Sequence, residues 1–431
     1  MERDLRDEPC LRMEHDAAKL QSPDDSSGLE LHQASHRGEL DEVKRLAEKE
    51  KLNPLQKDNN NDTALHHAAM GGHLNVMKYF IEEKYLVPAC MGWHGSTSLH
   101  YVALNKHLEL VRYLVAEQQV DPLCQDEDGF TPLHRACQGG DIDVVRYLVN
   151  EMNKYVPLKD VVYDKTKRGN TPIHHAALYG HLQVVKLFIL ELNCDLNTPG
   201  RWGRTPLHAA VQGGHLCIVR YLIEEMKCDP SYCSGEDKVT PLHMAAQYGH
   251  LEVVQYLTKE NYCNPLNRAV SGNTPLHDAA LNGHLKVVEF FISGLNCDPT
   301  TQGQWGTTPL HYAAQGGQLG IVKYLIEQLR CNPSHLDEQK VTPLHLAAWK
   351  GHLDVVKYLT QDKVCNPLCH SRNRDTPLHV AARLGQLEVV KYFIEALNCP
   401  PNIRGCRTMT PVEAAHSQGH AHVVQYLMSV V

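Results

Sequence analysis

One four-residue sequence, Thr-Pro-Leu-His with its close variants, recurs along this chain and constrains the fold more than any other feature. Successive copies are 34 residues apart, except for one step of 35 and one of 40. They begin at Thr63, Thr97, Thr131, Thr171, Thr205, Thr240, Thr274, Thr308, Thr342, Thr376 and Thr410, and a degenerate copy begins at Leu29. A chain with this period folds as a row of similar small units rather than as separate globular domains.

Each unit has the pattern of two short helices and a turn, as the unit that begins at Thr240 illustrates. Thr240 is a favourable N-cap, and the proline after it stands at the first helical position, where its missing N–H group costs nothing. Gly249 predicts a helix end in left-handed backbone. The second helix is apolar on more than one face, so we expect it to pack between neighbours. Turn residues before Thr274 predict a hairpin finger.

The recurring sequence T-P-L-H-x-A-A-x-x-G-H-L-x-V-V-x-Y-L resembles the ankyrin repeat, and the resemblance covers residues 29–431. It implies an all-α repeat solenoid of helix-turn-helix units joined by β-hairpin fingers. About twelve repeats are expected to start near 29, 63, 97, 131, 171, 205, 240, 274, 308, 342, 376 and 410. The last repeat carries atypical polar residues and is interpreted as a C-terminal cap. Residues 1–28 predict a polar lead-in, flexible or loosely helical, and a six-residue insertion predicts a longer finger in the fourth repeat.

Composition argues against several classes of protein. The formal net charge is −8, which disfavours binding to nucleic acid. The sequence has neither a run of eighteen apolar residues nor an apolar stretch near its start, so we expect no membrane insertion and no secretion. The cysteine count is odd, at 15, which favours a reducing compartment: the cytoplasm, or else the nucleus. No catalytic or phosphate-binding motif occurs, so we expect neither enzymatic activity nor a cofactor.

Histidine, cysteine and tyrosine recur at fixed positions of the unit, and we interpret all three sets as structural. The histidines are expected to hydrogen-bond to the backbone within or between repeats. Seven consecutive repeats have a cysteine at a position that is Leu or Val in earlier repeats, which predicts small core side chains. These are Cys194, Cys228, Cys263, Cys297, Cys331, Cys365 and Cys399. Adjacent repeats place them about 10 Å apart, too far for disulfides.

Specificity is expected at the positions that vary, because architecture explains those that repeat. In ankyrin-like arrays the partner usually meets the fingers and the exposed ends of the first helices. The candidate partner-binding residues at these positions are Trp93, Phe130, Tyr179, Arg201, Trp202, Arg204, Tyr248, Trp305, Trp349, Arg372, Arg374 and Arg383. Tryptophan and tyrosine dominate interface hot spots. The alternative is that each ring lies against a neighbouring finger or an adjacent arginine, and that the basic tips only keep the surface solvated.

These observations favour a non-catalytic scaffold or adaptor, a monomeric solenoid that binds one or more proteins through its fingers and its concave helix face. An alternative is the recognition subunit of a larger signalling or ubiquitin-ligase-type assembly, whose effector would be a separate subunit because the last helix ends the chain. A zinc- or redox-regulated sensor that uses the cysteines is a third, less favoured reading.

Overall fold

The computed structural model describes residues 26–259, 262–361 and 365–430. The chain forms two compact units, Met1–Lys167 and Arg168–Val431. Their described residues hold α-helices α1 to α25 and no strand, which confirms the predicted all-helical fold. The first helix begins at Ser26, just before the predicted start of the repeats. The rest of the predicted lead-in, residues 1–25, lies outside the described residues.

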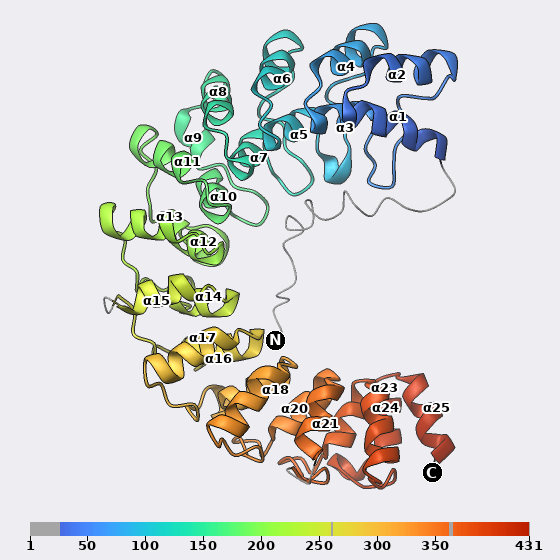
Figure 1. Cartoon of the computed structure of the whole chain (residues 1–431), viewed down its shortest axis with the longest axis vertical. Coiled ribbons are helices and arrows are strands. Elements are labelled where there is room, and N and C mark those ends of the chain that lie inside the picture. Colours follow the sequence, from blue (N-terminus) through green and yellow to red (C-terminus); the bar gives the residue numbers. More distant parts are fainter. Residues whose placement is uncertain (1–25, 260–261, 362–364, 431) are drawn as a thin grey trace. The chain divides into compact units, whose positions relative to one another are not determined.

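In the first unit, each repeat contributes one helix to an inner row and one to an outer row (Figure 1). Inner helices of consecutive repeats pack side by side, and each outer helix packs on the inner helix of its own repeat. The inner helices are α1 (Ser26–Arg37), α3 (Ala64–Gly71), α5 (Ser98–Leu104) and α7 (Pro132–Gly139). The outer helices are α2 (Leu40–Lys44), α4 (Leu74–Lys78), α6 (Leu108–Arg112) and α8 (Ile142–Met152).

The second unit follows the same plan over the remaining repeats. Its inner helices are α10 (Pro172–Leu178), α12 (Pro206–Gln212), α14 (Pro241–Tyr248), α16 (Pro275–Asn282), α18 (Pro309–Gln315), α20 (Pro343–Lys350), α22 (Pro377–Arg383) and α24 (Pro411–Ser417). Its outer helices are α11 (Leu182–Lys186), α13 (Leu216–Arg220), α15 (Leu251–Lys259), α17 (Leu285–Glu289), α19 (Leu319–Lys323), α21 (Leu353–Thr360), α23 (Leu387–Lys391) and α25 (Ala421–Val430). Helix boundaries therefore recur with the sequence period.

Most outer helices continue into a wider, π-helical turn. These turns are Arg45–Lys49, Tyr79–Glu83, Tyr113–Glu117, Leu187–Glu191, Tyr221–Glu225, Phe290–Gly294, Tyr324–Gln328 and Tyr392–Ala396. Among the described outer helices, α8, α15, α21 and the last one, α25, end without such a turn. The first three of these belong to the fourth, seventh and tenth repeats, which are three repeats apart, and α25 belongs to the twelfth.

The insertion in the fourth repeat is helical, which corrects the prediction of a longer finger. Its residues form α9 (Leu158–Val162), which packs against α8. Val161 and Val162 are buried, so this segment has an apolar face, and the neighbouring outer helix α8 helps to cover it. The sequence reading missed it because five residues are too few to show helical periodicity.

The histidine of the repeated tetrapeptide caps the inner helices from α3 to α22, as His345 shows, and Glu413 takes its place at α24. The ring Nδ1 of His345 accepts a hydrogen bond from the Thr342 N–H group at 3.2 Å. Its Nε2 therefore carries the proton and donates to the Asp375 carbonyl oxygen, at 3.1 Å, in the finger that follows. Burial lowers the pKa of His345 to about 4, so the ring is neutral at pH 7. Desolvation lowers the pKa to about 4 in the same way for His66, His100, His208, His243, His277 and His311.

The second histidine set and the tyrosines tie each repeat to the one before it. His284 Nε2 lies 2.9 Å from the Gln247 carbonyl oxygen of the preceding repeat. The Tyr256 hydroxyl donates to the Glu224 carboxylate at 3.0 Å, and the Arg220 guanidinium lies 5.3 Å from the Tyr256 ring centre. The predicted structural roles of histidine and tyrosine are therefore confirmed.

The cysteines behave as small apolar side chains. Six of the seven repeated cysteines are buried, Cys228 is half-buried, and every described cysteine is a free thiol. Cys263 is typical: its thiol donates to the Pro230 carbonyl oxygen at 3.1 Å, and burial raises its pKa to about 12. A thiol with such a pKa forms little of the thiolate that attacks oxidants or binds metals.

The loops between helix pairs form fingers, each numbered here after the repeat that it ends. Backbone hydrogen bonds link several adjacent fingers. They join Glu127 N to His94 O and Lys167 N to Asp128 O in the first unit, and Val270 N to Asp237 O, Glu338 N to Trp305 O and Arg372 N to Gln339 O in the second. One isolated antiparallel bridge, Ser234–Val239, occurs within a finger. The described fingers are thus hydrogen-bonded turns, and their description as β-hairpins stays a prediction.

Candidate functional site

In the part of the chain that the structure describes, fingers two, five, eight and eleven share a turn that the other fingers lack. Each contains a short 3₁₀ segment: Trp93–Gly95, Arg201–Gly203, Gln304–Gly306 and Cys406–Thr408. A glycine precedes each segment: Gly92, Gly200, Gly303 and Gly405. This kind of finger therefore recurs every third repeat, as do the outer helices α8, α15 and α21, which end without a π-helical turn. A Gly-x-x-Gly sequence occurs in three of these four fingers, whereas finger eleven has Thr408 at the second glycine position, so the sequence shows this longer period only in part.

Two tryptophans stand in left-handed backbone at the tips of these turns. Trp202 and Trp305 each have φ of 56°, and each is followed by a left-handed glycine. Two consecutive residues of this kind, closed by the Arg204 N to Arg201 O hydrogen bond of 3.2 Å, form a type I′ turn. This turn favours Asn, Asp or Gly at its first central position, and a bulky side chain there costs about 1–2 kcal/mol. Backbone strain of this size concentrates at functional sites.

The preceding finger fixes the position of each of these turns. The Asn170 side-chain oxygen accepts a hydrogen bond from Arg201 N at 2.9 Å. The Asn273 side-chain oxygen accepts from Gln304 N at 3.2 Å and from the Tyr312 hydroxyl at 2.8 Å. Because the anchors are side chains one finger away, both tryptophans project from supported turns rather than from loose loops.

The four tryptophans differ in what surrounds their rings. Trp305 is 58% exposed, and within the described part of the chain no ring or cation lies against it. Trp202 is 41% exposed, but its ring is 3.8 Å from the Arg201 guanidinium and 4.7 Å from that of Arg204. Trp93 and Trp349 are half-buried. Trp202 therefore fits the alternative of stacking on adjacent arginines, whereas Trp305 fits the expectation of an exposed contact residue.

The remaining aromatic candidates are less available. Phe130 is buried, and the Arg135 guanidinium lies 4.1 Å from its ring centre, so it is a packing residue. Tyr248 is 37% exposed, and its ring is parallel to that of His250 at 6.4 Å. Tyr179 is half-buried at the end of α10.

The basic candidates of the second unit fall into two kinds. Arg383 forms an ion pair with the buried Asp375 carboxylate at 2.7 Å and so stabilises the finger before it. Arg372 and Arg374 are exposed at the tip of finger ten. The same hollow is lined by these two arginines and by four residues that are not among the predicted contact residues: Lys340, His370, Ser371 and Arg404.

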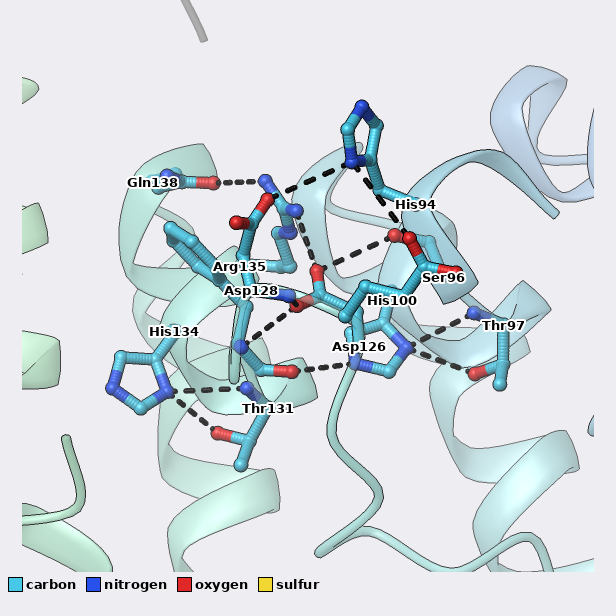
Figure 2. A network of polar contacts seen from close by, with 12 residues as sticks. His94, Ser96, Thr97, His100, Asp126, Asp128, Thr131, His134, Arg135 and Gln138 are labelled. Atoms are coloured by element: carbon cyan, nitrogen blue, oxygen red, sulfur yellow. Dashed lines mark hydrogen bonds and ion pairs between the residues drawn. The ribbon is translucent and has the colours of Figure 1, made fainter. Parts of the chain in front are cut away.

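A buried polar network holds finger three in the first unit (Figure 2). The Asp126 carboxylate accepts a 2.6 Å hydrogen bond from Arg135, whose side chain is 4% exposed. Its other oxygen accepts from Asp128 N at 3.0 Å and Phe130 N at 2.8 Å. Arg135 also donates to the Gln138 side-chain oxygen at 3.1 Å. The buried carboxylate of Asp126 in the finger and the buried guanidinium of Arg135 in α7 therefore neutralise each other's charge within the protein.

The described residues contain no group of three or more His, Cys, Asp or Glu residues placed to hold a metal ion. No helix in this part of the chain combines the length and the hydropathy that a bilayer crossing requires.

Paired helices that repeat every 34 residues, with linked fingers between them, define a tandem helical-repeat protein. The family model described as ankyrin repeats, in three copies, matches residues 31–126, 84–160, 158–232, 207–302, 276–369 and 360–430. The chain therefore belongs to the ankyrin-repeat family, whose members are generally non-catalytic modules of protein–protein interaction. No curated protein gives a significant match to this chain.

Proposed function

We propose that this protein is a non-catalytic scaffold that binds partner proteins through its fingers and the adjacent ends of its inner helices. The observation that carries the proposal is Trp305. It is a largely exposed tryptophan on a strained turn, and the equivalent position three repeats earlier holds Trp202. Neither stability nor solubility accounts for such a residue, since asparagine would suit the turn and the solvent better.

A protein interface does account for it. A buried tryptophan contributes 150–250 Å² of contact area with few rotatable bonds, so it recovers more free energy on binding than its strained backbone costs. Because the turns are already anchored, binding would not have to pay the entropic cost of ordering the finger loops. Trp305, Trp202 with its arginines, and half-buried Trp349 are the contact residues that we propose in the second unit.

Finer features of the proposal follow from the same residues. We propose hairpin fingers as the recognition elements and a monomer as the binding form, located in the cytoplasm or nucleus, where free thiols persist. An adaptor and a recognition subunit of a larger assembly would use the same surface. The buried, high-pKa thiols, such as that of Cys263, do not favour a zinc- or redox-regulated sensor.

A cross-linking pull-down from cell extract tests the proposal. The wild-type chain is compared with a Trp202→Asn/Trp305→Asn variant, because asparagine fits the turn and should keep the repeats folded. Tyr85→Asn is the matched control: Tyr85 is 84% exposed in left-handed backbone, but it follows an outer helix. We expect partners to be lost from the double variant alone, with equal circular dichroism for all three proteins. Identical partner lists would show that the tryptophans are not contact residues.

A further inference from the structure

Fingers nine, ten and eleven line an open, basic hollow of about 570 Å³ at the surface of the second unit. Six residues line it: Lys340 from finger nine, His370, Ser371, Arg372 and Arg374 from finger ten, and Arg404 from finger eleven. No acidic side chain is among them. Four permanent cations therefore face one space in a protein whose formal net charge is −8.

These cations have no counter-charge among the residues that the structure describes. Among the described residues, no carboxylate lies within ion-pair distance of Lys340, Arg372, Arg374 or Arg404. The nearby Asp375 carboxylate is already used, because Arg383 binds one oxygen at 2.7 Å and Cys406 N donates to the other at 2.9 Å. Four like charges without a partner repel one another, so an anion in the hollow would be stabilised.

A substitution within finger ten keeps the hollow free of negative charge. Fingers three and nine begin their turns with Asp126 and Asp337, whose carboxylates accept backbone N–H groups of the same turn. Ser371 holds the equivalent position in finger ten and makes the same closing bond, Ser371 N to Asp375 O, at 2.9 Å. The turn is thus retained while its carboxylate is replaced by a neutral hydroxyl, which can donate to an anion.

Two of the cations occupy strained backbone. Lys340 has φ of 56° and Arg374 has φ of 64° at the same position of consecutive fingers. Glycine takes that position in six other fingers: Gly95, Gly129, Gly169, Gly203, Gly272 and Gly306. A left-handed residue other than glycine costs about 1–2 kcal/mol. Lys238, with φ of 50°, holds the same position in finger six, but Lys340 and Arg374 are the two cations at this position that line the hollow.

Hydrogen bonds join the three fingers to one another before any ligand binds. Arg372 N donates to Gln339 O at 2.7 Å, which joins fingers nine and ten. Cys406 N donates to the Asp375 side-chain carboxylate at 2.9 Å, which joins fingers ten and eleven. Because the fingers are preorganised, binding an anion would require ordering only of side chains.

We propose that this hollow binds a phosphate group carried by a partner protein on serine, threonine or tyrosine. The inference rests on the proposed function and deepens it. A phosphate monoester carries about −1.5 to −2 charge and three acceptor oxygens, which suits several guanidinium groups at once. A single carboxylate would leave most of the positive charge unneutralised. Nucleic acid is less favoured, because it requires a basic stripe on a basic protein, whereas this hollow is local and the isoelectric point is about 6.4.

Fluorescence anisotropy with the full chain tests the inference. The probe is a labelled glycine- and serine-rich peptide with two adjacent phosphoserines, and its unphosphorylated form and a single-stranded oligothymidylate are compared with it. An Arg372→Ala/Arg374→Ala variant should weaken binding of the phosphopeptide by more than about tenfold, since each arginine removes charge-assisted hydrogen bonds. The matched control is Arg330→Ala/Lys227→Ala, which removes two exposed cations from left-handed backbone outside the hollow.

Equal binding of the two peptide forms, or equal losses in the two double variants, would overturn the inference. Tighter binding of the oligothymidylate than of the phosphopeptide would also overturn it, in favour of nucleic acid. The result is separable from the pull-down. Tryptophan-dependent partners without phosphopeptide binding would leave the proposed function standing and remove only the phosphate site.

Discussion

Fingers three and ten share one turn geometry, yet they treat charge in opposite ways. In finger three the Asp126 carboxylate closes the turn and pairs with buried Arg135, whose side chain is 4% exposed. In finger ten Ser371 takes the place of that aspartate, and Arg372 and Arg374 stay exposed and unpaired by any described carboxylate. The residue in left-handed backbone also differs: it is Gly129 in finger three and Arg374 in finger ten.

The difference separates charges that stabilise the fold from charges that are available to a ligand. A buried pair such as Asp126–Arg135 is satisfied by its own protein, so removing one member leaves the other desolvated. Exposed cations such as Arg372 contribute little to stability, and their removal should be felt in binding. Arg383 shows that nearness in the sequence does not decide the class, because it was a candidate contact residue like Arg372 and Arg374 and yet is paired with Asp375.

The largest expected effect is one that the two fingers share. Burial lowers the pKa of His100, beside finger three, and of His345, beside finger ten, to about 4. Since the unfolded pKa is about 6.5, the stabilisation is complete above pH 6.5 and is lost as the pH falls from there toward 4. At pH 5 each of the seven histidines whose pKa is lowered to about 4 should cost about 2 kcal/mol, so their summed effect of about 14 kcal/mol exceeds that of any single substitution. Urea unfolding at pH 7 and pH 5, followed by hydrogen exchange in each region, should show losses in both. An unchanged midpoint would contradict the structural role of the histidines.

Breaking the buried pair should have the next largest effect and should affect finger three alone. Asp126→Ala leaves Arg135 buried without its counter-ion and is expected to destabilise the first unit by about 3–5 kcal/mol. Arg372→Ala should change stability by less than about 0.5 kcal/mol. Urea unfolding measures both. The Asp126→Ala/Arg135→Met variant, which removes both charges, should recover much of the loss; if it does not, the cost lies elsewhere than in the unpaired cation.

Restoring the carboxylate in finger ten should make it resemble finger three. Ser371→Asp places a negative charge among the cations and is expected to weaken phosphopeptide binding about tenfold, without loss of stability. Ser371→Asn is the control, because it supplies a similar turn cap without charge and should retain most of the affinity. Anisotropy titrations of the two variants give the comparison, and equal affinities would show that charge does not govern the hollow.

The smallest expected effect concerns the backbone at the finger tips. Arg374→Gly gives finger ten the residue that finger three has at that position and should raise stability by up to about 1 kcal/mol, because glycine adopts left-handed backbone without strain. Arg372→Gly, outside left-handed backbone, should bring no such gain. Thermal unfolding of the two variants distinguishes them. A greater gain for Arg372→Gly would mean that strain at Arg374 is not the cause.

Much of the fold could be predicted because its rules are local. Thr240 and Gly249 bound their inner helix as predicted, since capping and left-handed helix ends depend on residues within one turn. The structural role of the repeated histidines was also predictable from their period. Helix α9 was missed because a five-residue segment is too short to show periodicity, and its burial depends on α8 beside it.

The candidate site was only partly predictable, for the opposite reason. The sequence by itself determined where the fingers lie, which of them carry tryptophan or arginine, and that each repeat must stack on its neighbours to bury its apolar faces. Only the tertiary structure decided that Phe130 is buried, that Trp305 is exposed, that Arg383 is paired and that Lys340 shares a hollow with Arg374. Those outcomes depend on the adjacent finger, which lies about one repeat away along the chain but in direct contact through space.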